Sequence, residues 1–196
     1  MKIVNYPHPA LRHKSKVLTS IDKKVRIQAG EMLELMYAHR GLGLAANQVA
    51  LPFQMLVMNA TGDPEQKEEE HVLINPKILD RKGSMEGQEG CLSFPELFQK
   101  VRRAKRVRAQ AYNLKGELVE VTWEDMHSRV LQHEIDHLHG ILFIDKFGTI
   151  AKMTSRSAIR YLEQEHQKAQ EKGSLASDEE LIAELKRLEE EQENPV

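Results

Sequence analysis

The sequence predicts an α+β protein, in which β-strands are mixed with helices that form separate segments. Three observations predict this class. Helical patterns lie near the start of the chain and over its last third, and strand patterns, including a hairpin, lie between them. The length of 196 residues is sufficient for one domain with a core and too short for two large ones.

The first helix is predicted over residues 23–39, where apolar residues recur at helical spacing and Gly41 follows as a stop. Short strands are predicted at residues 53–60 and 72–75. Pro76 follows the second run directly, and it cannot donate a ladder hydrogen bond. We therefore expect this strand to lie near a sheet edge or to end there.

A β-hairpin is predicted between residues 101 and 123, with its turn at residues 113–116 (NLKG). Helical signals then run from residue 123 to Gly140, a residue type that commonly follows a helix end. Another helix is predicted over residues 150–171. These assignments give four predicted strands, followed by consecutive helices.

The last segment is predicted to be a short helix, because Ser177 and Glu180 form a capping-box pattern. Its apolar stripe is narrow, formed by Leu181, Leu185 and Leu188, and the rest is strongly acidic. Three alternatives stay open for it: packing on the body of the protein, pairing with a basic strand, or partial disorder.

Composition places the chain among ordinary soluble proteins, with 40% apolar and 30% charged residues and a net charge of -2. This balance argues against a DNA-binding protein, and no apolar run approaches the roughly 20 residues that cross a membrane. With no signal or transit pattern at the start, we expect a cytoplasmic location. We divide the chain into a core at residues 1–149, a helix at 150–172 and an acidic extension at 173–196.

A metal site is indicated by His133, Glu134 and His137 in the predicted helix. Two histidines four residues apart project from one helix face, and two imidazoles can take two corners of a tetrahedral metal site. Glu134 is placed to take a proton from water activated by the metal. The alternative is a polar helix face without a metal.

The third ligand decides which kind of hydrolase this is. In extended zinc peptidases it would stand where this chain has Phe143, which cannot bind a metal. Asp145, Glu163 and Glu165 are weaker downstream candidates for such a peptidase. Cys91 is the better candidate, because a Cys/His/His set leaves one coordination position open. As the only cysteine, it cannot form an internal disulfide.

Three segments together resemble the signature motifs of peptide deformylases, in the same order: residues 41–48 (GLGLAANQ), 89–93 (EGCLS) and 132–137 (QHEIDH). The resemblance extends over about residues 3–150. It implies a deformylase-like fold, with mixed or antiparallel sheets around a central metal-binding helix and with helices at the C-terminus.

Position by position, the resemblance implies roles for six residues. The metal ligands would be Cys91, His133 and His137, and Glu134 would be the general base and acid. Gln48 and the backbone N–H of Leu92 would form the oxyanion hole. Members of the family hold one divalent metal, natively Fe²⁺ in many cases, and Ni²⁺, Co²⁺ or Zn²⁺ can replace it.

The activity implied is removal of the formyl group from the N-terminal formylmethionine of nascent polypeptides, with release of formate. The first competing hypothesis is the zinc peptidase. A second is a deformylase-like binding module without catalysis, which the presence of Gln48, Cys91 and Glu134 disfavours.

Substrate binding is predicted along the glycine-rich segments, where Gly43 and Gly90 would let an extended peptide backbone approach. A pocket of methionine size is then required. Its predicted wall consists of Leu42, Phe94, Val130 and the stem of Arg129.

Charged residues around these motifs receive simpler predictions. We expect Asp136 to form an ion pair with Arg102 or Arg103, and His139 to lie at the surface. Residues 100–108 carry six basic side chains, which predict a solvated strand face or, alternatively, a transient contact with ribosomal RNA.

Overall fold

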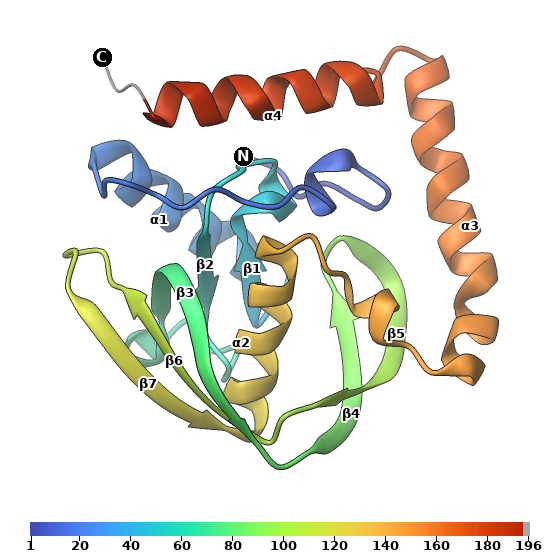
Figure 1. Cartoon of the computed structure of the whole chain (residues 1–196). Helices are drawn as coiled ribbons and strands as arrows, with labels where there is room; N and C mark the ends of the chain where they lie inside the picture. The colour runs from blue at the N-terminus through green and yellow to red at the C-terminus, as the bar shows by residue number, and fades with distance from the viewer. Residues whose placement is uncertain (194–196) are drawn as a thin grey trace.

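The computed structural model describes residues 1–193 and confirms the α+β class. Helix α2 (Asp125–Leu138) lies at the centre, between a five-stranded sheet and a two-stranded sheet (Figure 1). Within the described residues, no helix is long and apolar enough to cross a membrane.

The larger sheet has the strand order β1-β2-β3-β6-β7, and each neighbouring pair is antiparallel. Its strands are β1 (Gly43–Ala45), β2 (Met55–Met58), β3 (His71–Lys82), β6 (Arg106–Tyr112) and β7 (Leu118–Glu124). The smaller sheet pairs β4 (Met85–Cys91) with β5 (Phe94–Arg103), also antiparallel. The predicted hairpin is confirmed as β6 and β7.

The expectation for Pro76 is wrong, because β3 continues past it to Lys82 and lies inside the sheet. A register shift occurs between Ile74 and Lys77, and Asn75 has a φ of 51°. Such a bulge accepts a proline because the residue there does not need to donate to the neighbouring strand.

The β4–β5 hairpin was not predicted, because no strand was assigned to the sequence between residues 75 and 101. Its first strand has the sequence MEGQEGC, which contains no β-branched residue and two glycines, so local propensity gives no strand signal there. Pairing with β5 over its whole length forms the strand instead.

Helices α1 (Lys23–Ala38) and α2 form where the spacing predicts them. Helix α2 begins at Asp125, two residues later than predicted, because β7 extends to Glu124. It ends at Leu138, and Gly140 follows that end as expected, with a φ of 71° and its N–H donated to the carbonyl of His137.

Helix α2 contacts the larger sheet through an apolar face. Leu131, Ile135 and Leu138 belong to one buried cluster with Val107 and Ala109 of β6. This packing leaves the histidines of α2 directed away from that sheet, toward the β4–β5 hairpin.

The C-terminal arm consists of α3 (Thr149–Glu171) and α4 (Asp178–Glu193). The predicted capping box is present, since Ser177 and Glu180 each accept the other's backbone N–H. Of the three alternatives for the acidic segment, packing on the body is the one observed: Leu185 is only 2% exposed. Residues 194–196 of the predicted extension lie outside the described part of the chain.

Candidate metal centre

Three ligand atoms converge beside α2. The Sγ atom of Cys91 lies 3.3 Å from Nε2 of His137, which lies 3.2 Å from Nε2 of His133. All three atoms lie within 4.8 Å of one another, and both histidines are buried. The spacing of four residues places both imidazoles on one face of the helix. Cys91 is the last residue of strand β4, and this end of the strand lies next to the imidazoles.

The chemistry of this donor set fits a single divalent metal ion. One sulfur and two imidazole nitrogens are the ligands of catalytic sites that keep a further coordination position for water or substrate. Burial and the neighbouring His133 lower the pKa of His137 well below its usual value, which keeps this imidazole neutral and able to bind a metal.

Glu89 orients the first histidine. Its Oε2 atom lies 3.1 Å from Nδ1 of His133, so the opposite ring nitrogen faces the cluster. Arg103 donates two hydrogen bonds to the Glu89 carboxylate, each of 2.9 Å, and Arg129 donates a third of 2.6 Å. Although burial acts to raise it, the hydrogen bonds from His133 and Arg103 hold the pKa of Glu89 well below its ordinary range.

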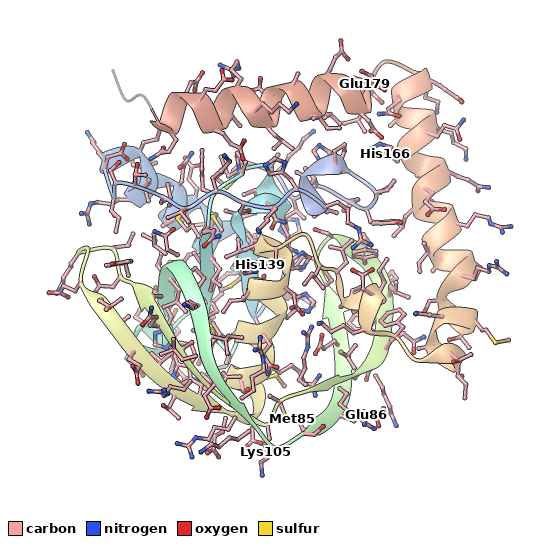
Figure 2. The ribbon with its side chains drawn as sticks, viewed as in Figure 1. Met85, Glu86, Lys105, His139, His166 and Glu179 are labelled. Atoms are coloured by element: carbon pink, nitrogen blue, oxygen red, sulfur yellow. The ribbon has the colours of Figure 1, made fainter. Side chains whose placement is uncertain are left out.

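The predicted ion pair of Asp136 is confirmed, with Arg103 as the partner. Lys146 also contacts this carboxylate, at 3.2 Å. Arg103 is therefore not part of a solvated basic face, which corrects the reading of residues 100–108. Arg106 and Arg108 in the same stretch pair with glutamates across the sheet, and His139 is exposed as predicted (Figure 2).

Glu134 lies beside the ligands, and strand β1 fixes its position. A methyl group at Gly43 would lie 2.5 Å from Oε1 of Glu134, so only glycine leaves room for the carboxylate. Within the described residues, Oε2 is buried without a hydrogen-bond partner. Burial raises the pKa of Glu134 to about 7, a value suited to proton exchange near neutral pH.

Gln48 is held so that its amide nitrogen faces the cysteine. Its Oε1 atom accepts the backbone N–H of Ala45 at 2.8 Å, which fixes the orientation of the amide. Its Nε2 atom lies 3.5 Å from Sγ of Cys91 and 3.3 Å from Oγ of Ser93. Leu92 stands in the two-residue turn after Cys91, so both predicted oxyanion-hole residues adjoin the ligand.

The predicted pocket residues occupy different environments. Leu42 is half-buried, Val130 is buried in the cluster around α2, and Phe94 stacks on Tyr6 inside the core. The Arg129 guanidinium is bound to Glu89. The space beside Gly90 is taken by an exposed aromatic ring, that of Phe98. Their role in binding methionine stays a prediction.

The downstream alternatives for the third ligand lie outside the cluster. Asp145 binds Arg12, with Nη2 and Oδ1 2.9 Å apart. Glu163 accepts a hydrogen bond from Tyr6, and Glu165 pairs with Lys168. The zinc-peptidase hypothesis therefore has no ligand from the downstream helices among the described residues.

Sequence analysis missed the supporting residues, above all Glu89 and Ser93. Glu89 stands two residues before Cys91, so a strand assigned to residues 85–91 would have placed both side chains near one face. Ser93 and Ala45, which hold the Gln48 amide, stand inside two of the three motifs, but the sequence offers no signal for their contacts with Gln48.

The fold and the site define a class of protein: a metal-dependent hydrolase with a Cys/His/His centre and an adjacent glutamate. The sequence profile of the polypeptide deformylase family matches residues 1–153. The chain belongs to this family, whose members remove the formyl group from N-terminal formylmethionine of newly made polypeptides. It is thus a metallohydrolase that acts on a linear amide.

Individual relatives agree with this assignment. A peptide deformylase of Rhodopirellula baltica is 40% identical over 178 residues, which cover 91% of this chain and 88% of that protein. One from Buchnera aphidicola is 44% identical over 145 residues, 74% of this chain and 82% of the relative.

Solved structures show the same fold. Peptide deformylase 1B of Arabidopsis thaliana superposes with a TM-score of 0.83 at 36% identity, over 89% of this chain and 95% of the other. The enzyme of Plasmodium falciparum gives a TM-score of 0.82 at 36% identity, over 85% and 97% of the two chains.

Proposed function

We propose that Cys91, His133 and His137 hold the catalytic metal of this deformylase, with Fe²⁺ as the native ion. The observation that carries the proposal is the convergence of one thiol and two imidazoles, all within 4.8 Å, beside a buried carboxylate. The metal, when bound, supplies Lewis-acid chemistry, which makes water acidic near neutral pH and polarises a carbonyl.

Glu134 would act as the general base and then as the general acid. Its carboxylate adjoins the ligands and keeps one buried oxygen without a partner among the described residues. That oxygen would accept a proton from the attacking water and return it to the amine that leaves the formamide. Gly43 keeps the carboxylate in place, because no larger residue fits against it.

Gln48 and the backbone N–H of Leu92 would stabilise the oxyanion that forms when the formamide becomes tetrahedral. Preorganised donors at such a position are each worth a few kcal/mol in the transition state. The fixed orientation of the Gln48 amide supports this role. Its oxygen accepts a hydrogen bond from the backbone N–H of Ala45, so its N–H donors face Cys91.

The formylated peptide would bind as an added strand along the free edge of β1. This strand pairs only with β2 among the described strands, and Gly43 lies in it next to Glu134. A peptide extending there would bring its N-terminal formyl group to the metal centre. Leu42, Gly90, Phe94, Val130 and the stem of Arg129 are the proposed surroundings of the methionine.

The place of action proposed is the cytoplasm, where formylated nascent peptides leave the ribosome. A transient ribosome contact would use the exposed basic residues Lys100, Arg102 and Lys105. Co-sedimentation with ribosomes that weakens steeply with salt supports this contact, and absence of co-sedimentation at low salt contradicts it.

The test is formate release from formyl-Met-Ala-Ser by protein loaded without oxygen with Fe²⁺, Ni²⁺ or Co²⁺. We expect turnover with the formylated peptide and no cleavage of unblocked Met-Ala-Ser. Metal analysis of protein purified without oxygen identifies the native ion. Cleavage of the unblocked peptide, or no formate with any of the three ions, contradicts the proposal.

A further inference from the structure

The N-terminal segment joins the two short segments that carry the proposed oxyanion-hole residues, the 3-10 helix Ala46–Val49 and the turn after Cys91. The backbone N–H of Val4 donates to the carbonyl of Gln48, and the N–H of Tyr6 donates to the carbonyl of Ser93, both at 2.9 Å. Ser93 follows Leu92 directly. Residues 4–6 therefore bridge Gln48 and the Leu92–Ser93 turn, in addition to the direct contact between Gln48 and Ser93.

This segment is itself held from the other side by α4, which lies against the short helix Pro9–Leu11 (Figure 1). Leu185 of α4 is 2% exposed and shares a buried cluster with Val4 and Leu11. Leu188, one turn later, packs against the separate cluster that contains α1 and β2. Helix α4 thus covers the segment and bridges two parts of the core.

Each end of α4 makes a polar contact with another part of the chain, one with α3 and one with the N-terminal region. Near its start, Asp178 binds Nε2 of His166 on α3 at 2.9 Å, at the corner where the two helices meet (Figure 2). Toward its end, Glu189 lies 2.7 Å from Nε2 of His13, in the loop that follows the short N-terminal helix. These two contacts orient the helix so that Leu185 faces the core.

We propose that α4 is a positioning element for catalysis, which presses residues 4–6 against the core and so keeps Gln48 and Leu92 at their working separation. The inference rests on the roles proposed above for these two residues. Two of the three proposed ligands, His133 and His137, are held by different contacts, those of α2 and Glu89, whereas Cys91 packs against the cluster that contains Leu185. Loosening α4 should therefore alter the transition state more than metal binding.

The decisive variant is Leu185→Ala in the full-length, nickel-loaded protein, with Ile182→Ala as the control. Ile182 lies on the same helix and is 40% exposed, so its truncation keeps the helix and leaves the buried cluster intact. Hydrogen exchange at the backbone amides of Val4 and Tyr6 measures directly how firmly residues 4–6 are held. Formate release per bound nickel gives kcat and KM.

We expect Leu185→Ala to speed exchange at both amides and to lower kcat about tenfold, since small displacements of catalytic groups have effects of that order or larger. KM and nickel content should stay within about twofold, and Leu185→Met should restore kcat. A purely structural role would lower the folded fraction and leave kcat per bound nickel unchanged.

Unchanged exchange at Val4 and Tyr6, or faster exchange with unchanged kcat, overturns the proposal. If Leu185→Ala folds poorly, Glu189→Gln replaces it, because that change removes only the charge facing His13 and should shift both readouts in the same direction. Gln48→Ala separates the two proposals: full activity in that variant refutes the oxyanion role, while the exchange data still report whether α4 holds the segment.

Discussion

The two sides of helix α2 are built by different rules. On one side, Leu131, Ile135 and Leu138 pack into the cluster of the larger sheet, and Leu131 and Leu138 are completely buried. On the other side, the buried His133 and His137 meet the half-buried Cys91. One helix of 14 residues therefore carries both the core and the metal centre.

The difference between the sides lies in how their atoms are satisfied. Packing alone satisfies the apolar side. On the polar side, Oε2 of Glu134 and Nδ1 of His137 are buried without partners among the described residues. Burying such groups costs free energy that the fold does not recover locally. Function accounts for that cost, since residues that break local rules of packing gather at active sites.

Glu134→Gln, on the polar side of α2, should have the largest effect, which is a loss of catalytic activity. The amide has nearly the same shape and cannot accept the water proton, so formate release should fall about 10³-fold. The metal content should stay the same. The change removes a buried carboxyl group, so the free energy of unfolding should not fall. A rate within tenfold of the parent enzyme would exclude Glu134 as the base.

Leu131→Ala, on the apolar side of α2, should instead lower the stability of the protein. Removing a completely buried leucine creates a cavity and should lower the free energy of unfolding by about 2–5 kcal/mol. Formate release per bound metal should not change. Urea unfolding measures the loss, and Met126→Ala, 47% exposed on the same helix, is the control with an expected change below about 0.5 kcal/mol. A large fall in kcat would mean that the two sides are not separable.

Gly43→Ala tests how tightly the polar side is fitted. The added methyl group would lie 2.5 Å from Oε1 of Glu134 and should displace the carboxylate, with a loss of about 10- to 100-fold in kcat. The matched control is Gly30→Ala in α1, where nothing lies within 4 Å of the new methyl group. That change should stabilise the helix by up to about 1 kcal/mol and leave kcat unaltered. Equal activity of both variants would contradict the tight fit.

Asp145→Asn gives the smallest expected effect and tests the border of the metal centre. Although burial acts to raise it, the hydrogen bond from Arg12 lowers the pKa of Asp145. The carboxylate therefore stabilises the fold above about pH 4, and this contribution is lost as the pH falls through the folded-state pKa.

Because the Asp145 side chain is 37% exposed, its contribution should be below about 1 kcal/mol. Urea unfolding at pH 7 and pH 3 should show a difference between parent and variant only at the higher pH. Metal content should be unaffected. Loss of the metal from Asp145→Asn would return this residue to the list of ligands.

Local periodicity was enough to place the main helices and the β6–β7 hairpin, because these elements depend on contacts between residues close in the chain. It failed for β4, whose glycine-rich sequence becomes a strand only by pairing with β5. It also failed at Pro76, where a bulge that depends on β6 carries β3 onward. Such pairings are set by distant partners and leave no periodic signal.

By itself, the sequence determined the helix that carries His133, Glu134 and His137, since a spacing of four residues fixes the relation of side chains on a helix. With the resemblance of its three motifs, it also predicted the family. Only the tertiary structure decided that Glu89 orients His133, that Gly43 confines Glu134, and that α4 reaches back over residues 4–6. Those relations join residues far apart in the chain, and burial and hydrogen bonding bring them together only in the folded protein.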